Sequence, residues 1–159
     1  MSTYFIDFQG FYNENTMIIK ELCVIDANNI FNPYHQVFNL GISPSILAEK
    51  TQFTNKYLSN YYHYLKWEEG TSLFCPTCIL NKFDDTNALF FVLDKVDGIK
   101  INTLKNYFPS WRLVNYNKTM IDLPQTPSNI KCPLREHGQQ CAYKQSLSMA
   151  IDYCTTFLL

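Results

Sequence analysis

Three residues of the kind that binds metal ions lie close together late in the sequence: Cys132, His137 and Cys141. Zinc in proteins prefers cysteine thiolates and histidine imidazoles in a tetrahedral shell. Cys132 precedes a proline, which places it in a loop that can bend around an ion, and Cys141 lies where the last predicted helix begins. The free amides and the dipole at the start of a helix favour a thiolate there. The spacing therefore predicts a structural zinc site with one coordination position left for another ligand.

Glu21 is the candidate for the fourth ligand. It stands in an otherwise apolar stretch that is predicted to be a strand, where an inward-pointing carboxylate needs a cation or hydrogen-bond donors. Alternation places its side chain on the face of Ile19 and Cys23, and the side chain of Lys20 on the opposite face. A simpler interpretation stays open, in which Glu21 lies at the surface of a half-exposed strand and the cysteines are unrelated buried thiols.

Cys75 and Cys78 form a Cys-x-x-Cys motif, which occurs in redox-active sites and as half of a zinc knuckle. The redox interpretation needs a strand directly before the motif, and the knuckle needs a second such motif. The sequence contains no second Cys-x-x-Cys, and the segment from Thr71 to about Phe83, after Gly70, is predicted to be a helix. A structural role is therefore the favoured interpretation, and redox activity and a second metal site are the alternatives.

The composition is that of one globular domain. The chain has 159 residues, enough to bury roughly two-thirds of its unfolded surface, and 47% of them are hydrophobic. Aromatic residues make up 16%, so they are expected to supply much of the core volume. The formal net charge of −1 gives no broad positive field, which argues against strong sequence-independent binding to a long duplex but leaves room for a local basic patch.

The sequence predicts neither export nor a membrane span. The first residues lack the basic segment and apolar stretch of a secretory signal, and no run reaches the roughly 18 apolar residues of a membrane helix. We therefore expect a soluble intracellular protein without membrane contact, cytoplasmic or nuclear. In that reducing environment, six cysteines favour metal or redox sites over a disulfide framework.

The hydrophobic pattern predicts an α/β domain with a mixed sheet. It begins with an antiparallel meander of three strands, at Tyr4–Phe8, Met17–Ile25 and Tyr34–Leu40. Helices and strands then alternate: a helix over 52–67, the helix over 71–83, a buried strand at 88–93, a helix over 100–108, a strand at 111–115 and a helix over 141–158. This is the element order of the ribonuclease H-like fold, a mixed five-stranded sheet with flanking helices. Since no linker or repeat divides the chain, residues 1–159 are expected to form one domain.

An aromatic stripe runs along the first of these helices. Four residues recur at steps of four and so share one face: Phe53, Tyr57, Tyr61 and Leu65. For most of the three residues Tyr61, Tyr64 and Trp67, packing in the core is the favoured role. Stacking of these rings on the bases of a single-stranded nucleic acid is the alternative.

Two resemblances connect these residues to known families. The first resemblance is to the Glu-Cys-His-Cys signature of the Maelstrom domain. It is carried by four residues in the same order: Glu21, Cys132, His137 and Cys141. That domain is a ribonuclease H-like relative of the DEDD exonucleases and is found in piRNA-pathway proteins. The chain also resembles small insect and insect-virus or transposon-associated proteins, through four spaced segments: Tyr4–Phe11, Lys20–Leu22, Asn60–Trp67 and Cys132–Ala142. The resemblance implies a ribonuclease H-like domain, with a role connected to mobile elements or viruses.

The catalytic carboxylates of the DEDD exonucleases are only partly present. Those enzymes begin with Asp-x-Glu on the first strand, because two divalent ions need several carboxylates to hold them. The matching positions here are Asp7 and Gln9, and an amide supplies no charge to balance a metal pair. In the histidine-containing branch of that family an Asp follows the His on the last helix, whereas His137 is followed by Cys141. These departures favour a domain that has exchanged its catalytic ions for one structural zinc.

We therefore expect a zinc-stabilised, catalytically degenerate domain that binds RNA, another single-stranded nucleic acid or a protein partner. Asp7 is then expected to cap or hydrogen-bond near the end of the hairpin. The first alternative is an active nuclease, an exonuclease or endonuclease that depends on magnesium or manganese, in which Asp7 is catalytic. Its acidic site would draw on His63 and Asp94 or Asp97, although a structural role is favoured for that histidine. The second alternative is a protein-interaction adaptor whose aromatic surface binds a partner.

Overall fold

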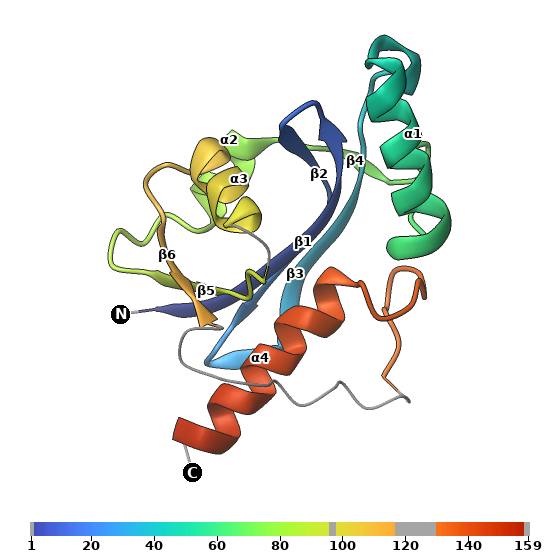
Figure 1. Ribbon diagram of the computed structural model, residues 1–159. Coiled ribbons are helices and arrows are strands. Elements are labelled where there is room, and N and C mark those ends of the chain that lie inside the picture. The colour runs from blue at the N-terminus through green and yellow to red at the C-terminus, as the bar shows by residue number, and fades with distance from the viewer. Residues whose placement is uncertain (1, 96–97, 117–129, 158–159) are drawn as a thin grey trace.

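The computed structural model describes residues 2–95, 98–116 and 130–157. They form a six-stranded mixed sheet with helices on both faces (Figure 1). The strands are β1 (Thr3–Asn13), β2 (Thr16–Asp26), β3 (Asn29–Asn39), β4 (Ser72–Leu73), β5 (Leu89–Val92) and β6 (Arg112–Asn115). The helices are α1 (Glu49–Tyr57), α2 (Pro76–Lys82), α3 (Ile99–Tyr107) and α4 (Ala142–Phe157), with a 3-10 turn at Pro44–Ile46 and a π-turn at Leu58–Tyr62. Within these ranges no helix has the length and apolar character needed to cross a bilayer.

The strand order across the sheet is β4-β3-β2-β1-β5-β6. The strands β1, β2 and β3 form the predicted antiparallel meander, while β5 runs parallel to β1 and β6 parallel to β5. The prediction of a mixed α/β sheet with flanking helices is confirmed, but the described sheet has six strands rather than five. The additional strand, β4, pairs with the end of β3. Gly70 precedes it and permits a close approach, because a β-carbon there would lie 2.3 Å from the carbonyl carbon of Phe38.

Both faces of the central strands are covered. The helices α2 and α3 pack on one face of the sheet, and α4 crosses the other (Figure 1). The apolar cluster under α2 and α3 includes Ile6, Phe8, Leu22, Val24, Ile79 and Leu104. The cluster under α4 includes Phe5, Cys23, Ile25, Leu147, Met149 and Ala150. The alternation of β1 and β2 thus fills two cores at once, since successive side chains point to opposite faces.

A β-bulge in β2 changes which side chains share a face. Gln9 of β1 pairs with Glu21, and the next residue of β1 pairs with Ile19. Lys20 is therefore the extra residue of β2. Strict alternation, which predicted Ile19 on the face of Glu21, is wrong across the bulge. Ile19 packs in the cluster under α2 and α3, whereas Glu21 hydrogen-bonds the start of α4 and Cys23 lies under that helix, as predicted.

The bulged residue, Lys20, is fully buried. Its ammonium group donates hydrogen bonds to three backbone carbonyls, those of Phe38 and Trp67 at 2.8 Å each and that of Glu69. Burial lowers the pKa of Lys20 to about 8, although nearby glutamates oppose this effect. Because Phe38 belongs to β3 and the other two acceptors to the loop before β4, one side chain fixes that loop to the sheet.

Some predicted boundaries are wrong. The strand β1 continues through Gln9–Gly10, where the sequence predicted its end, because Gly10 sits beside the bulge: a β-carbon there would lie 2.2 Å from the carbonyl oxygen of Ile18. The helix predicted over 52–67 begins earlier and ends with the π-turn. The segment over 71–83 consists of β4, a short connection and α2 rather than one helix. The predicted end of the last helix, Leu158, lies outside the described residues.

The aromatic stripe on α1 faces away from the core. Phe53, Tyr57 and Tyr61 have exposed fractions of 77%, 57% and 68%. The prediction of core packing is confirmed for Trp67 and is wrong for Tyr61 and Tyr64, which are exposed. The side chain that docks α1 on the sheet is Asn55, which accepts a hydrogen bond from the backbone N–H of Tyr12 at 2.7 Å and donates one to its carbonyl at 2.9 Å. This polar contact turns the opposite side of the helix, with its aromatic rings, toward solvent.

Candidate metal centre and the adjoining pocket

Four buried side chains from two distant parts of the chain converge at the start of α4. One comes from β2 and three from the segment that leads into the helix. Each places a ligand atom within 4.8 Å of those of the other three: Glu21, Cys132, His137 and Cys141. We call them the Glu-Cys-His-Cys cluster. The structure thus brings together the four predicted ligands, and two thiols, an imidazole and a carboxylate at this spacing are able to hold a metal ion.

Glu21 stands at the centre of the cluster. Its Oε2 lies 3.0 Å from Nε2 of His137, 3.7 Å from Sγ of Cys132 and 3.8 Å from Sγ of Cys141. Its Oε1 accepts a hydrogen bond of 2.7 Å from the backbone N–H of Ala142, the first residue of α4. A carboxylate is favourable at this place because a helix N-terminus carries unpaired amides and a partial positive charge. One oxygen therefore caps the helix while the other faces the three remaining ligand atoms.

The ring of His137 has the orientation of a metal ligand. Its Nδ1 lies 2.8 Å from the backbone carbonyl of His63, which can only accept, so Nδ1 carries a proton. The other ring nitrogen, Nε2, faces the carboxylate of Glu21. Histidines that bind metals commonly donate their second ring N–H to a carbonyl or carboxylate in this way, which fixes the tautomer and aims the ligating nitrogen at the ion.

Shared protons balance the charges of the cluster. Burial opposes a charge on His137, but hydrogen bonds with Cys132 and Glu21 outweigh it and raise the pKa of the imidazole to about 10. Burial also raises the pKa of Glu21, but hydrogen bonds from His137 and His35 hold that pKa below its usual value. A hydrogen bond from Cys141 lowers the pKa of Cys132, and the same bond raises the pKa of Cys141. A divalent cation held by all four groups would replace these protons.

His35 is a member of the site that the sequence analysis missed. Its Nε2 lies 2.8 Å from Oε2 of Glu21 and 3.9 Å from Sγ of Cys132, and its ring stacks on Tyr143 of α4. Because a carboxylate only accepts, Nε2 of His35 carries a proton and donates it to Glu21. In the register of β2 and β3, His35 stands opposite Cys23, which places it on the face that α4 covers. The register of the hairpin was the missing information.

Replacing His35 with Phe is expected to weaken metal binding without changing the number of ions bound. Phenylalanine keeps a ring against Tyr143 but removes the hydrogen bond that orients Glu21, and loss of such an outer contact typically costs about 10- to 100-fold in metal affinity. Competition with a chelator of known affinity measures the change. Asn32→Ala, at an exposed position of the same strand, is the matched control and should bind as the unaltered chain does. Equal affinities in both variants would show that His35 does not position the carboxylate.

Glu136 shapes the loop that carries the ligands. One of its carboxylate oxygens accepts a hydrogen bond from the backbone N–H of Cys132 at 3.0 Å, and the other from that of Gly138 at 3.1 Å. Lys144 of α4 forms an ion pair with Glu136 and donates to the carbonyl of Gly138 at 3.0 Å. These contacts fold the loop back on itself, so that Cys132 and His137 face the same point.

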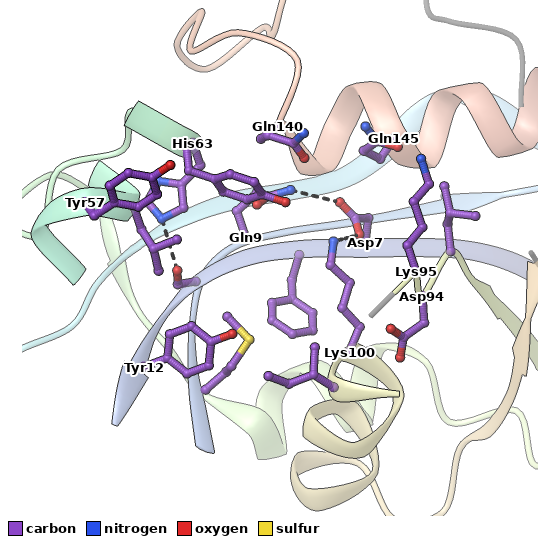
Figure 2. Close-up of a pocket in the computed structure, with 17 residues that line it drawn as sticks. Asp7, Gln9, Tyr12, Tyr57, His63, Asp94, Lys95, Lys100, Gln140 and Gln145 are labelled. Atoms are coloured by element: carbon purple, nitrogen blue, oxygen red, sulfur yellow. Dashed lines mark hydrogen bonds and ion pairs between the residues drawn. The ribbon is translucent and has the colours of Figure 1, made fainter. Parts of the chain in front are cut away.

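Asp7 lies in the middle of β1 and lines a pocket near the cluster (Figure 2). The prediction that it caps or hydrogen-bonds near the end of the hairpin is wrong about the position, because β1 continues for six residues beyond it, to Asn13. Its carboxylate forms an ion pair with Lys100 of α3, and the side-chain amide of Gln9 lies 3.5 Å from its other oxygen. Burial raises the pKa of Asp7 to about 6, although Lys100 partly offsets this effect.

Amide, aromatic and basic side chains surround Asp7. They line a cavity of about 500 Å³ and come from β1, α1, the π-turn, α3, the loop after β5, α4 and the segment just before α4: Gln9, Tyr12, Tyr57, Tyr62, Lys95, Lys100, Gln140 and Gln145. In Figure 2 the two glutamines of the α4 end lie across the pocket from Tyr12 and Lys100. The pocket opens past the carboxyl end of β5, beside β1, and α/β sheets commonly bind ligands at such ends.

Two other predicted members of an acidic site, His63 and Asp94, line the same pocket as Asp7, and both also hydrogen-bond the backbone. Asp94 accepts a hydrogen bond of 3.0 Å from the backbone N–H of Ile101 in the first turn of α3. The ring of His63 hydrogen-bonds the carbonyl of Gly10 at 3.0 Å and accepts from the backbone N–H of Leu65 at 3.1 Å, and burial lowers its pKa to about 4. His63 is thus a neutral, fully bonded residue, as the structural interpretation predicted. Asp97 lies outside the described residues.

Asp7→Asn is expected to remove a pH dependence of stability between about pH 4 and 6. The pKa of Asp7 is raised from 3.8 to about 6, so the folded state holds a proton that the unfolded chain releases. This stabilisation is complete below the unfolded pKa and is lost as the pH rises through the folded one. Relative to the variant, the free energy of unfolding should fall by about 2 kcal/mol across this range.

Urea denaturation of both chains at several pH values measures this difference, and comparison with the variant cancels the pH dependence of every other group. Asp84→Asn, at an exposed position, is the control that should leave the pH profile unchanged. Parallel profiles for the unaltered chain and Asp7→Asn would contradict the prediction.

Comparison with protein-family models, with curated proteins and with solved structures gives no match to this chain. No similarity therefore assigns a family or an activity. Two neighbouring features of the described part of the chain combine several polar side chains: the Glu-Cys-His-Cys cluster, which is able to hold a metal, and the Asp7 pocket beside it.

Proposed function

We propose that the Glu-Cys-His-Cys cluster is a structural zinc site. The donor set supports zinc, because thiolates and imidazole suit this ion, whereas magnesium and calcium prefer oxygen ligands alone. Four protein ligands fill a tetrahedral shell, whereas catalytic zinc keeps one position for water or substrate. Elemental analysis of the purified protein tests this assignment, with one zinc per chain as the expected result. A metal-free protein that is fully folded would overturn it.

We also propose that the domain is ribonuclease H-like, as its resemblance to the Maelstrom domain implies. The order β3-β2-β1-β5-β6, once the two-residue strand β4 is set aside, supports this proposal. So does the arrangement of an antiparallel meander followed by two parallel strands, with helices on both faces. A role in silencing mobile elements or viruses, which the resemblance also implies, belongs to the same proposal.

We infer that this domain binds RNA or another single-stranded nucleic acid in the Asp7 pocket without cleaving it. The observation that carries the inference is the ion pair of Asp7 with Lys100. Two-metal cleavage needs several carboxylates around the ions, whereas here a lysine ammonium already neutralises the carboxylate of the central strand. Gln9 adds no charge, and Asp94 is engaged at the start of α3. The pocket therefore has the features of a binding site rather than a two-metal centre.

The remaining side chains of the pocket suit a single strand. Tyr57 and Tyr62 are exposed at its rim and offer rings on which bases can stack. Gln140 and Gln145 offer amides that can both donate to and accept from base edges. Lys95 is exposed and available to a phosphate. Because the formal net charge of the chain is −1, these local contacts rather than a general positive field would hold the strand.

Titration with labelled single-stranded RNA and DNA across a salt series tests the binding. We expect affinity that falls with salt, and a loss of about tenfold in Tyr57→Ala, since stacking on one base is worth about 1–3 kcal/mol. Phe53→Ala is the matched control, because Phe53 is exposed on the same helix but does not line the Asp7 pocket. Absence of binding would favour the alternative of a protein-interaction adaptor.

Incubation of the same strands with magnesium or manganese tests the absence of cleavage. We expect no turnover. Cleavage that is lost in Asp7→Ala, with zinc content and fold retained, would overturn the degenerate assignment and establish the alternative of an active metal-dependent nuclease.

A further inference from the structure

We propose that Cys75 and Cys78 form a reactive pair that exchanges with thiols and disulfides of low molecular weight, such as glutathione. The two residues are joined by a disulfide, whereas Cys23, Cys132, Cys141 and Cys154 are free thiols. The sequence argued against a redox role because it predicted a helix, and not a strand, directly before the motif. A strand, β4, lies there instead, and α2 begins directly after Cys75. The motif therefore has the strand-to-helix setting that a redox site requires.

A purely structural role explains this disulfide poorly. Only two residues separate Cys75 from Cys78, and the chain entropy that a disulfide removes from the unfolded state falls as the closed loop becomes shorter. The local turn is also held by other contacts. Pro76 occupies the first turn of α2, and the backbone N–H of Ile79 donates to the carbonyl of Cys75 at 3.2 Å. Breaking the S–S bond should therefore leave the segment folded.

The two sulfurs differ in a way that directs the exchange. Cys78 is an exposed residue and Cys75 is half-buried. The backbone N–H of Cys78 donates to Sγ of Cys75 at 3.2 Å. A donor at this sulfur favours its charged form, which makes Cys75 the better leaving group. An incoming thiolate is therefore expected to attack Sγ of Cys78.

The exchange balances as a two-electron transfer. A glutathione thiolate attacks Sγ of Cys78, the protein S–S bond breaks, and Cys75 leaves as a thiolate. A second glutathione thiolate then attacks the glutathione sulfur of the mixed disulfide, and Cys78 leaves. Glutathione is oxidised to its disulfide and the protein is reduced to a dithiol, and the two protons lost by the attacking thiols pass to Cys75 and Cys78. The same steps in reverse oxidise the protein.

This site is separate from the metal cluster. Helix α2 covers one face of the sheet and Glu21 points to the other, toward α4. The free thiols Cys23, Cys132 and Cys141 are buried, so an external thiol reaches none of them directly. The redox state of the pair can thus change while the metal ligands stay intact.

Equilibration in glutathione redox buffers, followed by alkylation and peptide mass spectrometry, tests the proposal. Cys75 and Cys78 should interconvert together between disulfide and dithiol, while the three buried cysteines stay unmodified by glutathione. When the disulfide form reacts with limiting glutathione and the reaction is stopped with acid, the trapped mixed disulfide should lie on Cys78 rather than on Cys75 by at least about fivefold, because the exposed sulfur is attacked and Cys75 leaves. Circular dichroism verifies that the reduced protein is folded.

A second measurement follows turnover. The protein should accelerate exchange between glutathione and hydroxyethyl disulfide at least about tenfold over the Cys75→Ser/Cys78→Ser double variant. A pair that stays oxidised in every buffer, or a protein no faster than the double variant, would overturn the proposal. Neither outcome depends on zinc or nucleic acid, so this proposal and the proposed function can fail separately.

Discussion

Cys132→Ser is expected to abolish zinc binding and to lower the free energy of unfolding by at least about 4 kcal/mol. Structural zinc contributes about 10–16 kcal/mol of binding free energy in small zinc domains, and this contribution is lost with the ion, so about 4 kcal/mol is a lower limit. Loss of the proposed cation also leaves Glu21 and His137 as a buried ion pair that only shared protons balance, which lowers stability further. Because Glu21 caps the first turn of α4, the start of that helix should detach first.

Urea denaturation and elemental analysis of the same sample measure both effects. Cys154→Ser is the matched control, because Cys154 is a half-buried free thiol on α4 outside the cluster. This variant should keep one zinc per chain, and its free energy of unfolding should fall by less than about 1 kcal/mol. A Cys132→Ser protein that retains the metal, or one that unfolds at the same urea concentration as the unaltered chain, would refute the structural role.

Lys20→Met is the second substitution with a large expected effect: it should lower the free energy of unfolding by about 3 kcal/mol. Methionine has a similar length but cannot donate, so the carbonyls of Phe38, Trp67 and Glu69 lose a shared donor. A buried acceptor without a partner costs about 1–3 kcal/mol, and removal of the buried ammonium offsets part of the sum. The loop before β4 should then separate from β3.

Thermal and urea unfolding measure the loss, and hydrogen exchange locates it at the loop and β4. Lys66→Met, at an exposed position of the same loop, is the control and should change stability by less than about 0.5 kcal/mol. Equal stabilities of the two variants would mean that Lys20 does not fix the loop.

The convergence of the four candidate metal ligands could be predicted because the signal is chemical and partly local. Cys132, His137 and Cys141 are close in sequence, and Glu21 was conspicuous as a carboxylate in an apolar strand. The meander and the buried strand β5 were readable from apolar runs. In each case the type of a residue, or the pattern of apolar residues along the chain, was enough to make the prediction.

Other features depend on pairing between distant strands, which no local pattern reports. The bulge at Lys20 placed Ile19 on the opposite face from the predicted one. The register of β3 brought His35 to the cluster, which no local sequence pattern indicated. The exposure of Tyr57 follows from one asparagine, Asn55, that docks the opposite side of α1. The strand β4 has only two residues, too few to show a period.

The helix α4 has a consequence for how the chain is made. Its contacts with Glu21 of β2 span 121 residues of sequence, so the nascent meander leaves the ribosome long before the helix that covers it. Until α4 is made, the apolar face that contains Phe5 and Ile25 is exposed to solvent. Of the four candidate metal ligands, only Glu21 is then present. Contacts between residues so far apart in the sequence slow folding and leave aggregation-prone intermediates. Newly synthesised chains should therefore need chaperone protection, and an adequate zinc supply should shorten that interval.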